Sequence, residues 1–289
     1  MHKLIYIKPM EPFTFTAVIF TKNEENNIRE CIATLPPHIP IVIVDSDSID
    51  QTRNIAEAAG VRVLNFKWNG KYPRKKEWTR QQFSENEWLL LLDADLRCTP
   101  SLYQECLKVI ASSKFSSALI PINYWFMGKE LKFGSKPSYI GLLNVGKCKY
   151  PDVELDNLGY GDIEFHYQPI CHGLTAKVKN PINHMDRDPV VSWIDRHVRY
   201  ANYQAQLELH PRVMEEMNKN KTLRGKVLYR LPFRAISQFI YSYVLKLGFL
   251  DGVPGFRYAY LHAHHYYLAR IIGIDYKNIS SFNATRKDE

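Results

Sequence analysis

Two aspartates separated by one residue follow a strongly apolar run. The run Trp88–Leu92 is continuously hydrophobic, and Asp93, Ala94 and Asp95 come directly after it. At the C-terminal end of a strand, residues i and i+2 point in the same direction, so both carboxylates are expected to face one site. Hard oxygen ligands suit Mg²⁺ or Mn²⁺, and such an ion eases the departure of a diphosphate. The alternative is a polar turn in which Asp95 is a solvated helix cap, because the D-x-D pattern is short and common.

Polar residues also gather at the ends of two earlier apolar runs. Thr21, Asn23 and Glu24 follow the first run, and Asp45 and Ser46 follow the second. Ligands of an open parallel sheet bind beyond the carboxyl ends of its strands, so three polar strand ends predict one crevice. The alternative role is helix capping, which needs one side chain per helix rather than a cluster of four or five. The surplus of polar residues favours a binding site.

These polar ends require strands to position them, and the chain supplies a regular pattern. Apolar runs rich in β-branched residues alternate with polar amphipathic stretches, a rhythm that predicts a mainly parallel, doubly wound α/β sheet. The predicted strands are Phe15–Thr21, Ile39–Val44, Arg62–Phe66, Trp88–Leu92 and Ala118–Pro121. The predicted helices are Asn26–Leu35, Asp50–Ala59, Arg74–Phe83 and Ser101–Ile110. Continuous hydrophobicity in the strands indicates that helices cover both faces of the sheet.

The rest of the chain divides into two parts. Residues 122–183 are rich in aromatic residues, glycines and short candidate strands, which predicts a substrate-binding lobe rather than a second sheet domain. After Pro189 the pattern becomes helical, with Trp193, His197 and Ala201 at helical spacing, and a further helical section is predicted over 223–272.

Composition limits the partners and the compartment. The chain has 289 residues, 45% of them hydrophobic, and a net charge of +8 that favours phosphates, acidic lipid surfaces or nucleic acid. The five cysteines are scattered and contain no C-x-x-C pair, so we expect no disulfide framework and a reducing compartment. The apolar patch Leu4–Ile7 is too short for a signal peptide, and the tract Ala235–Leu250 is too short and too polar to cross a bilayer. We therefore expect a cytoplasmic protein.

Four segments together resemble one enzyme family. They are Thr21–Glu25 (T-K-N-E-E), Val44–Asp50 (V-D-S-D-S-x-D), Lys75–Trp78 (K-K-E-W) and Glu87–Asp95 (E-W-L-L-L-L-D-A-D). The combination is similar to the family-2 glycosyltransferases, and in particular to the bacterial lipopolysaccharide-core glucosyltransferase-like group. That group also has segments similar to Trp193–Ala201 and Gly248–Gly252, so the resemblance extends from Phe13 to about Tyr260.

The resemblance implies a GT-A fold, a Rossmann-like and mainly parallel sheet with helices on both faces, followed by a helical C-terminal extension. A glycosyltransferase domain would occupy residues 13–188, with a nucleotide-sugar half at 13–121 and an acceptor half at 122–188. Residues 189–289 would form the helical region. The implied reaction inverts the anomeric carbon of the transferred sugar.

Site roles follow from the resemblance position by position. The residues implied to bind the nucleotide sugar are Thr21, Asn23, Glu24, Asp45, Ser46, Lys76 and Asp93. The implied ligands of Mg²⁺ or Mn²⁺ are Asp95, Asp93 and His184, the last because GT-A enzymes commonly place a C-terminal histidine near the metal. Lys76 belongs to a basic segment that leads into a helix, and its charge faces either phosphate or solvent. A lone histidine such as His184 is also often structural.

A second acidic motif supplies candidates for the catalytic base. Inverting transfer needs a carboxylate that takes the proton of the acceptor hydroxyl. The segment Gly161–His166 contains Asp162 and Glu164 and resembles the acidic motif that provides this base, with Asp162 slightly favoured. Tyr167 stands where the group often has a glutamate, and a polar strand edge is the alternative.

The C-terminal section interleaves basic residues with apolar and aromatic ones over Arg224–Leu247. A helix of this kind lies either in an anionic membrane interface or against the catalytic domain with a basic rim. The first alternative predicts peripheral contact with the inner face of the cell membrane.

Taken together, these patterns predict that the protein is a metal-dependent hexosyltransferase. It moves a sugar from a nucleoside-diphosphate donor, with a UDP-hexose as the first candidate, to a glycan or lipid-linked acceptor in cell-envelope polysaccharide or lipopolysaccharide synthesis. One rival is a sugar-nucleotide nucleotidyltransferase, which usually carries a glycine-rich basic loop where this chain has Thr21–Glu25. The other is a non-catalytic nucleic-acid binder, against which the acidic crevice argues, so no nucleic-acid partner is expected.

Overall fold

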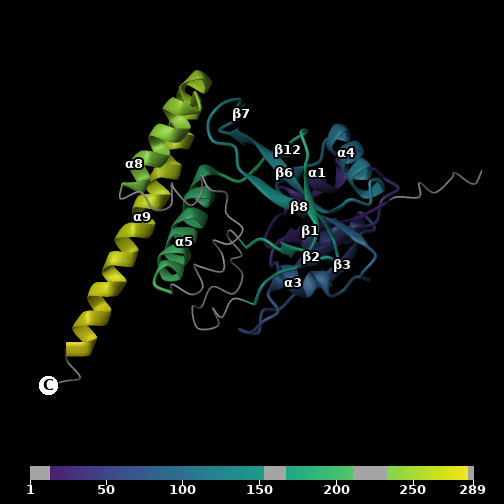
Figure 1. Ribbon diagram of the computed structural model, residues 1–289, viewed down its shortest axis with the longest axis horizontal. Coiled ribbons are helices and arrows are strands. Elements are labelled where there is room, and N and C mark those ends of the chain that lie inside the picture. The colour runs from purple at the N-terminus through teal and green to yellow at the C-terminus, as the bar shows by residue number, and fades with distance from the viewer. Residues whose placement is uncertain (1–13, 153–166, 211–232, 286–289) are drawn as a thin grey trace, which may run out of the picture.

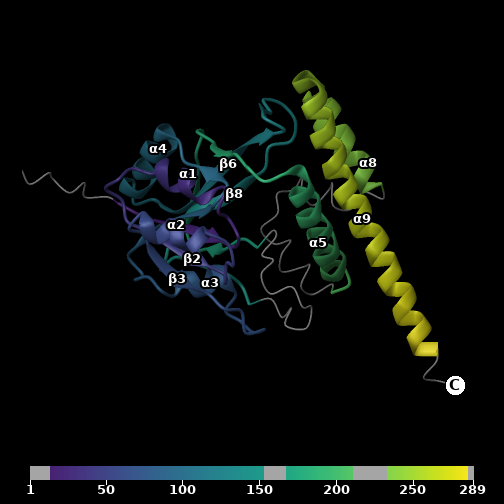
Figure 2. The same ribbon diagram turned by 180° about the vertical axis from the view of Figure 1, so that it is seen from behind.

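The computed structural model describes residues 14–152, 167–210 and 233–285. A domain built on one twisted sheet occupies one side of the molecule, and long helices lie along its other side (Figure 1). The view from behind shows the same arrangement, with the last helix extending beyond the sheet domain (Figure 2). The polar strand ends predicted to form a crevice all belong to the sheet domain.

Four parallel strands form the first half of the sheet. They are β1 (Thr16–Thr21), β2 (Ile41–Asp45), β3 (Arg62–Asn65) and β4 (Trp88–Asp93), in the order β3-β2-β1-β4. In the central strand β1, Phe20 lies opposite Val44 on one side and Asp93 on the other. The first four predicted strands are therefore confirmed, and their carboxyl ends share one edge.

Three short helices connect these strands, and a longer one follows β5 (Leu96–Arg97) and leads to β6 (Phe115–Phe126). They are α1 (Ile28–Ala33), α2 (Thr52–Ala58), α3 (Lys75–Arg80) and α4 (Pro100–Ala111). The first three are shorter than predicted, while α4 is slightly longer. Its start is well defined because the Thr99 side chain accepts a hydrogen bond from the Leu102 N–H and Pro100 occupies the first helical position.

Alternate residues of each strand enter different cores, which explains the unbroken apolar runs. Ala17 and Ile19 of β1 pack with apolar residues of α1, α2 and α4 on one face of the sheet. Val18 and Phe20 pack on the other face with residues from α3 and from the long helix α5 (Val190–Glu208). The sheet is thus covered on both faces, as predicted.

The second half of the sheet is mixed. β8 (Ser138–Asn144) lies antiparallel between β4 and the long strand β6 (Phe115–Phe126). β12 (Ile182–His184) runs parallel to β6 and antiparallel to β5 (Leu96–Arg97). β7 (Lys129–Glu130) and β11 (Leu174–Lys177) also pair with β6. Residues 122–152 and 167–188 therefore add strands to this sheet, and their assignment as a substrate-binding lobe stays a prediction.

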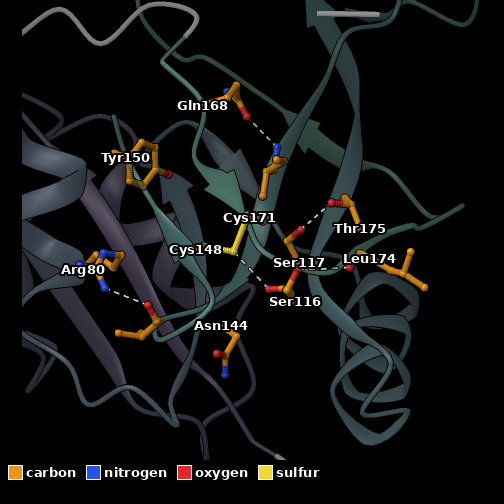
Figure 3. Close-up of a disulfide and its surroundings, with 12 residues drawn as sticks. Arg80, Ser116, Ser117, Asn144, Cys148, Tyr150, Gln168, Cys171, Leu174 and Thr175 are labelled. Carbon is orange, nitrogen blue, oxygen red and sulfur yellow. Dashed lines mark hydrogen bonds between the residues drawn. A yellow bond between two sulfur atoms is a disulfide. The ribbon is translucent and has the colours of Figure 1, made fainter. Parts of the chain in front are cut away.

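A disulfide closes a small two-stranded sheet beside the main one. Cys148 of β9 (Cys148–Lys149) is joined to Cys171 of β10 (Ile170–Cys171). Figure 3 shows the bridge next to β6, where the Cys148 sulfur lies 3.3 Å from the carbonyl oxygen of Ser116. The expectation of unpaired cysteines is wrong for this pair, because tertiary folding brings together residues whose spacing carries no disulfide pattern.

The C-terminal helices form a hairpin beside α5. Its first arm is α8 (Arg234–Phe239) followed by the π-helix η1 (Ile240–Leu245), and its second arm is the long helix α9 (Gly252–Thr285), joined through the 3₁₀-helix η2 (Gly248–Asp251). The sequence predicts one helical section here, but the chain reverses at Leu247 and Gly252, where φ is +58° and +68°. Among the described residues, no helix combines the length and apolarity required to cross a bilayer.

Candidate functional site

The ends of β1 and β2 are cross-linked by side chains. The Thr21 hydroxyl donates to the Asp45 carboxylate at 2.8 Å, and Asp45 is fully buried. The Ser48 N–H and hydroxyl also donate to Asp45, at 3.0 and 2.5 Å. Asn23 accepts from the Ile49 N–H at 2.9 Å, which fixes the two loops against each other. These contacts form a rigid floor at the predicted nucleotide pocket.

Helix capping accounts for only part of this polar cluster, in which Asp50 accepts from the Thr52 N–H at 3.0 Å at the start of α2. Neither Asn27 at the start of α1 nor Gln51 at the start of α2 makes a side-chain capping hydrogen bond. The Ser46 hydroxyl is buried and has no hydrogen-bond partner in the protein. An unsatisfied buried hydroxyl is costly unless a ligand or water completes it. The surplus of polar groups noted in the sequence is therefore consistent with a binding surface.

The D-x-D motif meets His184 beyond the end of β4. The Asp95 Oδ2 atom lies 3.1 Å from the His184 Nε2 atom. This proximity has a topological cause: β12, which ends in His184, pairs with β5, which begins one residue after Asp95. The Met185 N–H also donates to the Asp95 carbonyl oxygen at 2.8 Å. Two of the three predicted metal ligands are thus brought together from distant parts of the sequence.

The electrostatics of this pair favour the charged forms of both groups. Burial raises the pKa of Asp95, but the charge and hydrogen bond of His184 outweigh it, so the pKa of Asp95 is lowered. Burial lowers the pKa of His184, but the Asp95 carboxylate outweighs it, so the pKa of His184 is raised. Asp95 is consequently an anion that a divalent cation could bind after displacing the histidine proton.

Two more acids surround the pair. Glu24 is desolvated by burial and repelled by Asp95, and together these raise its pKa to about 8, although a hydrogen bond from Asn27 opposes the shift. Asp93 is exposed at the strand end, yet the protein packed around it removes water, and with the Asp95 charge this raises its pKa against the influence of Lys76. Such a concentration of acids with raised pKa values is typical of a site that binds a cation.

Asp93 and Lys76 line one small cleft that is open to solvent. Its wall also contains Tyr139, Tyr150 and Gln168, and the Gln168 side chain accepts from the Ile140 N–H at 2.9 Å (Figure 3). The structure thus places the predicted Lys76 next to the D-x-D motif. Arg74 of the same basic segment is buried and donates to the Tyr203 hydroxyl at 3.0 Å, so it faces neither phosphate nor solvent.

The residues present fit a divalent cation in part. Within the described ranges, no group of three or more His, Cys, Asp or Glu side chains is already arranged around a metal position. The Asp95 Oδ1 and His184 Nδ1 atoms are nevertheless buried without a hydrogen-bond partner. Asp95 Oδ1 is a ligand atom of the kind that Mg²⁺ or Mn²⁺ takes, whereas the His184 nitrogen that faces Asp95 is Nε2 rather than the unpartnered Nδ1. The predicted bases Asp162 and Glu164 lie outside the described residues.

Some residues of the site were not predicted from the sequence. Tyr124 packs on the His184 ring with centroids 4.7 Å apart. Arg196 of α5 donates to Asp186 and Asp188, which hold the loop after His184. The only available signal was position, because Arg196 lies in the segment Trp193–Ala201 that contributes to the family resemblance.

Sequence comparison identifies the family. The pattern of glycosyl transferase family 2 matches residues 16–170, more than half of the chain. The chain belongs to glycosyl transferase family 2. It is 33% identical over 246 residues to the uncharacterized glycosyltransferase RT0209 of Rickettsia typhi, covering 82% of this chain and 79% of that one. The predicted GT-A fold is confirmed by the family match together with the sheet described above.

Other similarities of this family-2 chain are partial or weak. It is 33% identical over 103 residues to the lipopolysaccharide core biosynthesis glycosyltransferase LpsC of Rhizobium meliloti, covering 34% of this chain and 37% of that one. Its match to three further Rickettsia glycosyltransferases spans about a third of their length. The crystal structure of S. aureus TarS 1-349 in complex with UDP-GlcNAc has 13% identity and a TM-score of 0.42, covering 92% of both chains.

Proposed function

We propose that this chain is an inverting, metal-dependent glycosyltransferase that uses a nucleoside-diphosphate sugar, with a UDP-hexose as the first donor to test. The observation that carries the proposal is the pairing of Asp95 with His184 beyond β4, with one atom of each buried and unsatisfied. Family membership supports the transfer reaction, and this pair supports the metal.

The residues of the crevice have separate proposed roles. Thr21, Asp45 and Ser46 would hold the nucleoside, because their polar atoms converge at the ends of β1 and β2. Asn23 and Glu24 would complete this pocket from the loop after β1. Lys76 would contact phosphate from the opposite wall of the cleft that contains Asp93.

Asp95, Asp93 and His184 are the proposed metal ligands. A bound Mg²⁺ or Mn²⁺ would neutralise charge that develops on the departing diphosphate. Asp162 or Glu164 would take the proton of the acceptor hydroxyl as its oxygen attacks the anomeric carbon from the side opposite the diphosphate. Both assignments remain predictions from the family resemblance.

The proposed acceptor is a glycan or lipid-linked sugar of the cell envelope, and the proposed location is the inner face of the cell membrane. The similarity to LpsC over 103 residues supports lipopolysaccharide synthesis as the process to test.

A thermal-shift panel of nucleotide sugars tests the donor and the metal together. Each sugar is added with Mn²⁺ or with EDTA, and UDP release is then measured for the donor that binds. A donor present at 100 times its Kd stabilises the folded state by about 2.7 kcal/mol. We expect this stabilisation with Mn²⁺ and its loss in EDTA.

Asp95→Asn is the informative variant because it removes the charge and preserves the shape. The matched control is Asp275→Asn, an exposed aspartate on α9. We expect Asp95→Asn to lose metal-dependent binding and the control to retain it. Equal stabilisation in EDTA would refute the metal assignment, and stabilisation by no nucleotide sugar would refute the donor class.

A further inference from the structure

Exposed apolar side chains are concentrated in the C-terminal hairpin. Twenty-three large hydrophobic residues are exposed in the described part of the chain, and fifteen of them lie in residues 233–279. These fifteen are Phe233, Ile236, Ile240, Val244, Leu245, Leu247, Phe249, Leu250, Val253, Phe256, Tyr260, Tyr267, Ile271, Ile274 and Ile279. A concentration of exposed apolar side chains in one part of a protein marks an interaction site.

The densest part of this surface is the turn of the hairpin. We call Leu245, Leu247, Phe249, Leu250 and Val253 the apolar tip, and between 45% and 68% of the surface of each side chain is exposed. Leu247 adopts φ +58°, a conformation that a leucine takes rarely and that glycine or asparagine would take more easily. An apolar side chain is thus held outward at a strained position.

The tip is fixed to the sheet domain. The Asp251 carboxylate accepts from the Lys132 and Phe133 N–H groups at 3.1 and 2.9 Å. The Lys246 carbonyl oxygen accepts from the Gly134 N–H at 2.8 Å. In both ribbon views the turn of the hairpin lies beside the β6–β7 hairpin (Figures 1 and 2). The apolar side chains are therefore presented in a set orientation.

The charges around the tip are positive. Lys132, Lys246 and Arg257 are exposed, and the Arg257 side chain contacts Met127 of the β6–β7 hairpin. Asp251 lies in the turn itself, but it is 3% exposed and engaged in the contacts described above. Asp275 is the only exposed acid within residues 233–279. An apolar surface with a basic rim is complementary to anionic lipid headgroups above acyl chains.

The exposed stripe of α9 continues the same surface. Val253, Phe256, Tyr260, Tyr267 and Ile274 recur at intervals of three, four or seven residues, which places them on one face of the helix. A second copy of the chain is a poorer occupant, because a symmetric contact through the tip would bring two basic rims together.

We propose that the apolar tip and the exposed stripe of α9 bind the surface of an anionic phospholipid bilayer. The Tyr258 ring, on α9, lies 5.4 Å from the Tyr124 ring, which packs on His184. Membrane contact would therefore hold the site close to the lipid surface, and, if the proposed function is correct, close to a lipid-linked acceptor.

Vesicle co-sedimentation tests the proposal without any transfer reaction. The full chain is mixed with phosphatidylcholine vesicles that contain or lack phosphatidylglycerol. We expect binding to the anionic vesicles, and at least a tenfold loss of binding in the double variant Leu245→Ser/Leu250→Ser. The matched control is Ile49→Ser/Leu174→Ser, which removes two apolar side chains of the sheet domain that are 91% and 64% exposed, against 68% and 52% for the tip pair.

Charge-reversal variants test whether the basic residues around the apolar tip contribute to vesicle binding. Lys132→Glu/Lys246→Glu should weaken binding, since each cation near the surface contributes about fivefold, or about 1 kcal/mol. Lys108→Glu/Lys114→Glu changes the same net charge at and after α4 and should have little effect. Insertion of the apolar tip into the bilayer is measured separately with the variant Phe249→Trp. The fluorescence of the added tryptophan should shift to shorter wavelength when anionic vesicles are present.

Absence of wild-type binding to anionic vesicles would overturn the proposal, as would equal losses in the tip and control variants. A dimer that the tip variant dissociates, without vesicle binding, would assign the surface to a second copy instead. Failure of nucleotide-sugar binding in the thermal-shift panel would leave the vesicle result unaffected, so the two proposals fail independently.

Discussion

The Asp95 carboxylate lies 3.1 Å from the His184 ring, although Asp95 is in the turn between β4 and β5 and His184 ends β12, far away in the chain. His184→Ala should weaken Mn²⁺ binding at least about tenfold, since even changes to groups behind metal ligands cost about 10- to 100-fold. Titration calorimetry measures the affinity. His172→Ala removes an exposed histidine and serves as the control. Unchanged affinity in His184→Ala would exclude it as a ligand.

Tyr124 should position His184 through its ring. Tyr124→Ala removes the ring contact at 4.7 Å and should lower the free energy of unfolding by about 3 kcal/mol while weakening Mn²⁺ binding. Tyr124→Phe keeps the ring and removes only the hydrogen bond with the Tyr258 hydroxyl, so it should preserve Mn²⁺ binding and lower the free energy of unfolding by only about 1 kcal/mol. Chemical denaturation measures the free energy of unfolding of both variants, and Mn²⁺ titration measures their affinity for the metal. If the two variants bind Mn²⁺ equally, the positioning role is wrong.

Stability should fall as the pH drops below about 6.5, the ordinary histidine value. Burial, with the charges of neighbouring histidines, lowers the pKa of His197 to about 3 and of His262 to about 4, and burial lowers that of His265 to about 4. The unfolded chain therefore binds more protons than the folded chain between about pH 6.5 and 4, and each histidine contributes at most about 1.4 kcal/mol per pH unit.

The histidine contribution can be separated by substitution. His262→Phe should flatten the dependence of the unfolding free energy on pH, while His264→Phe, which changes an exposed histidine, should not. Denaturation curves at several pH values measure the slopes. Identical slopes in wild type and His262→Phe would contradict the prediction.

The Cys148–Cys171 disulfide should be detectable by thiol counting. Under denaturing conditions without reductant, three thiols should react, those of Cys31, Cys98 and Cys106, and five should react after reduction. Reduction should lower the free energy of unfolding by about 3 kcal/mol, because the bridge closes a loop between β9 and β10. Five reactive thiols before reduction would show that the pair is not bonded in the isolated protein.

The sequence by itself determined the parallel half of the sheet. The apolar runs before Thr21, Asp45 and Asp93 are continuous because alternate residues enter different cores, so the sequence alone showed where these strands lie. The carboxyl ends of parallel strands share one edge of the sheet. The order of the motifs along the chain therefore predicted that their polar residues would lie at that edge. The helix at Val190–Glu208 was likewise predictable from its apolar spacing.

Tertiary structure alone decided which residues meet. His184 reaches Asp95 because β12 pairs with β5, and Cys148 reaches Cys171 because β9 pairs with β10. Arg74 is buried because it packs against Tyr203 of α5, which lies far away in the chain. The apolar residues after Phe233 looked alike in the sequence, and only the reversal at Leu247 decided which of them face solvent. Local periodicity reports the environment of a segment, whereas long-range pairing depends on contacts that no local pattern contains.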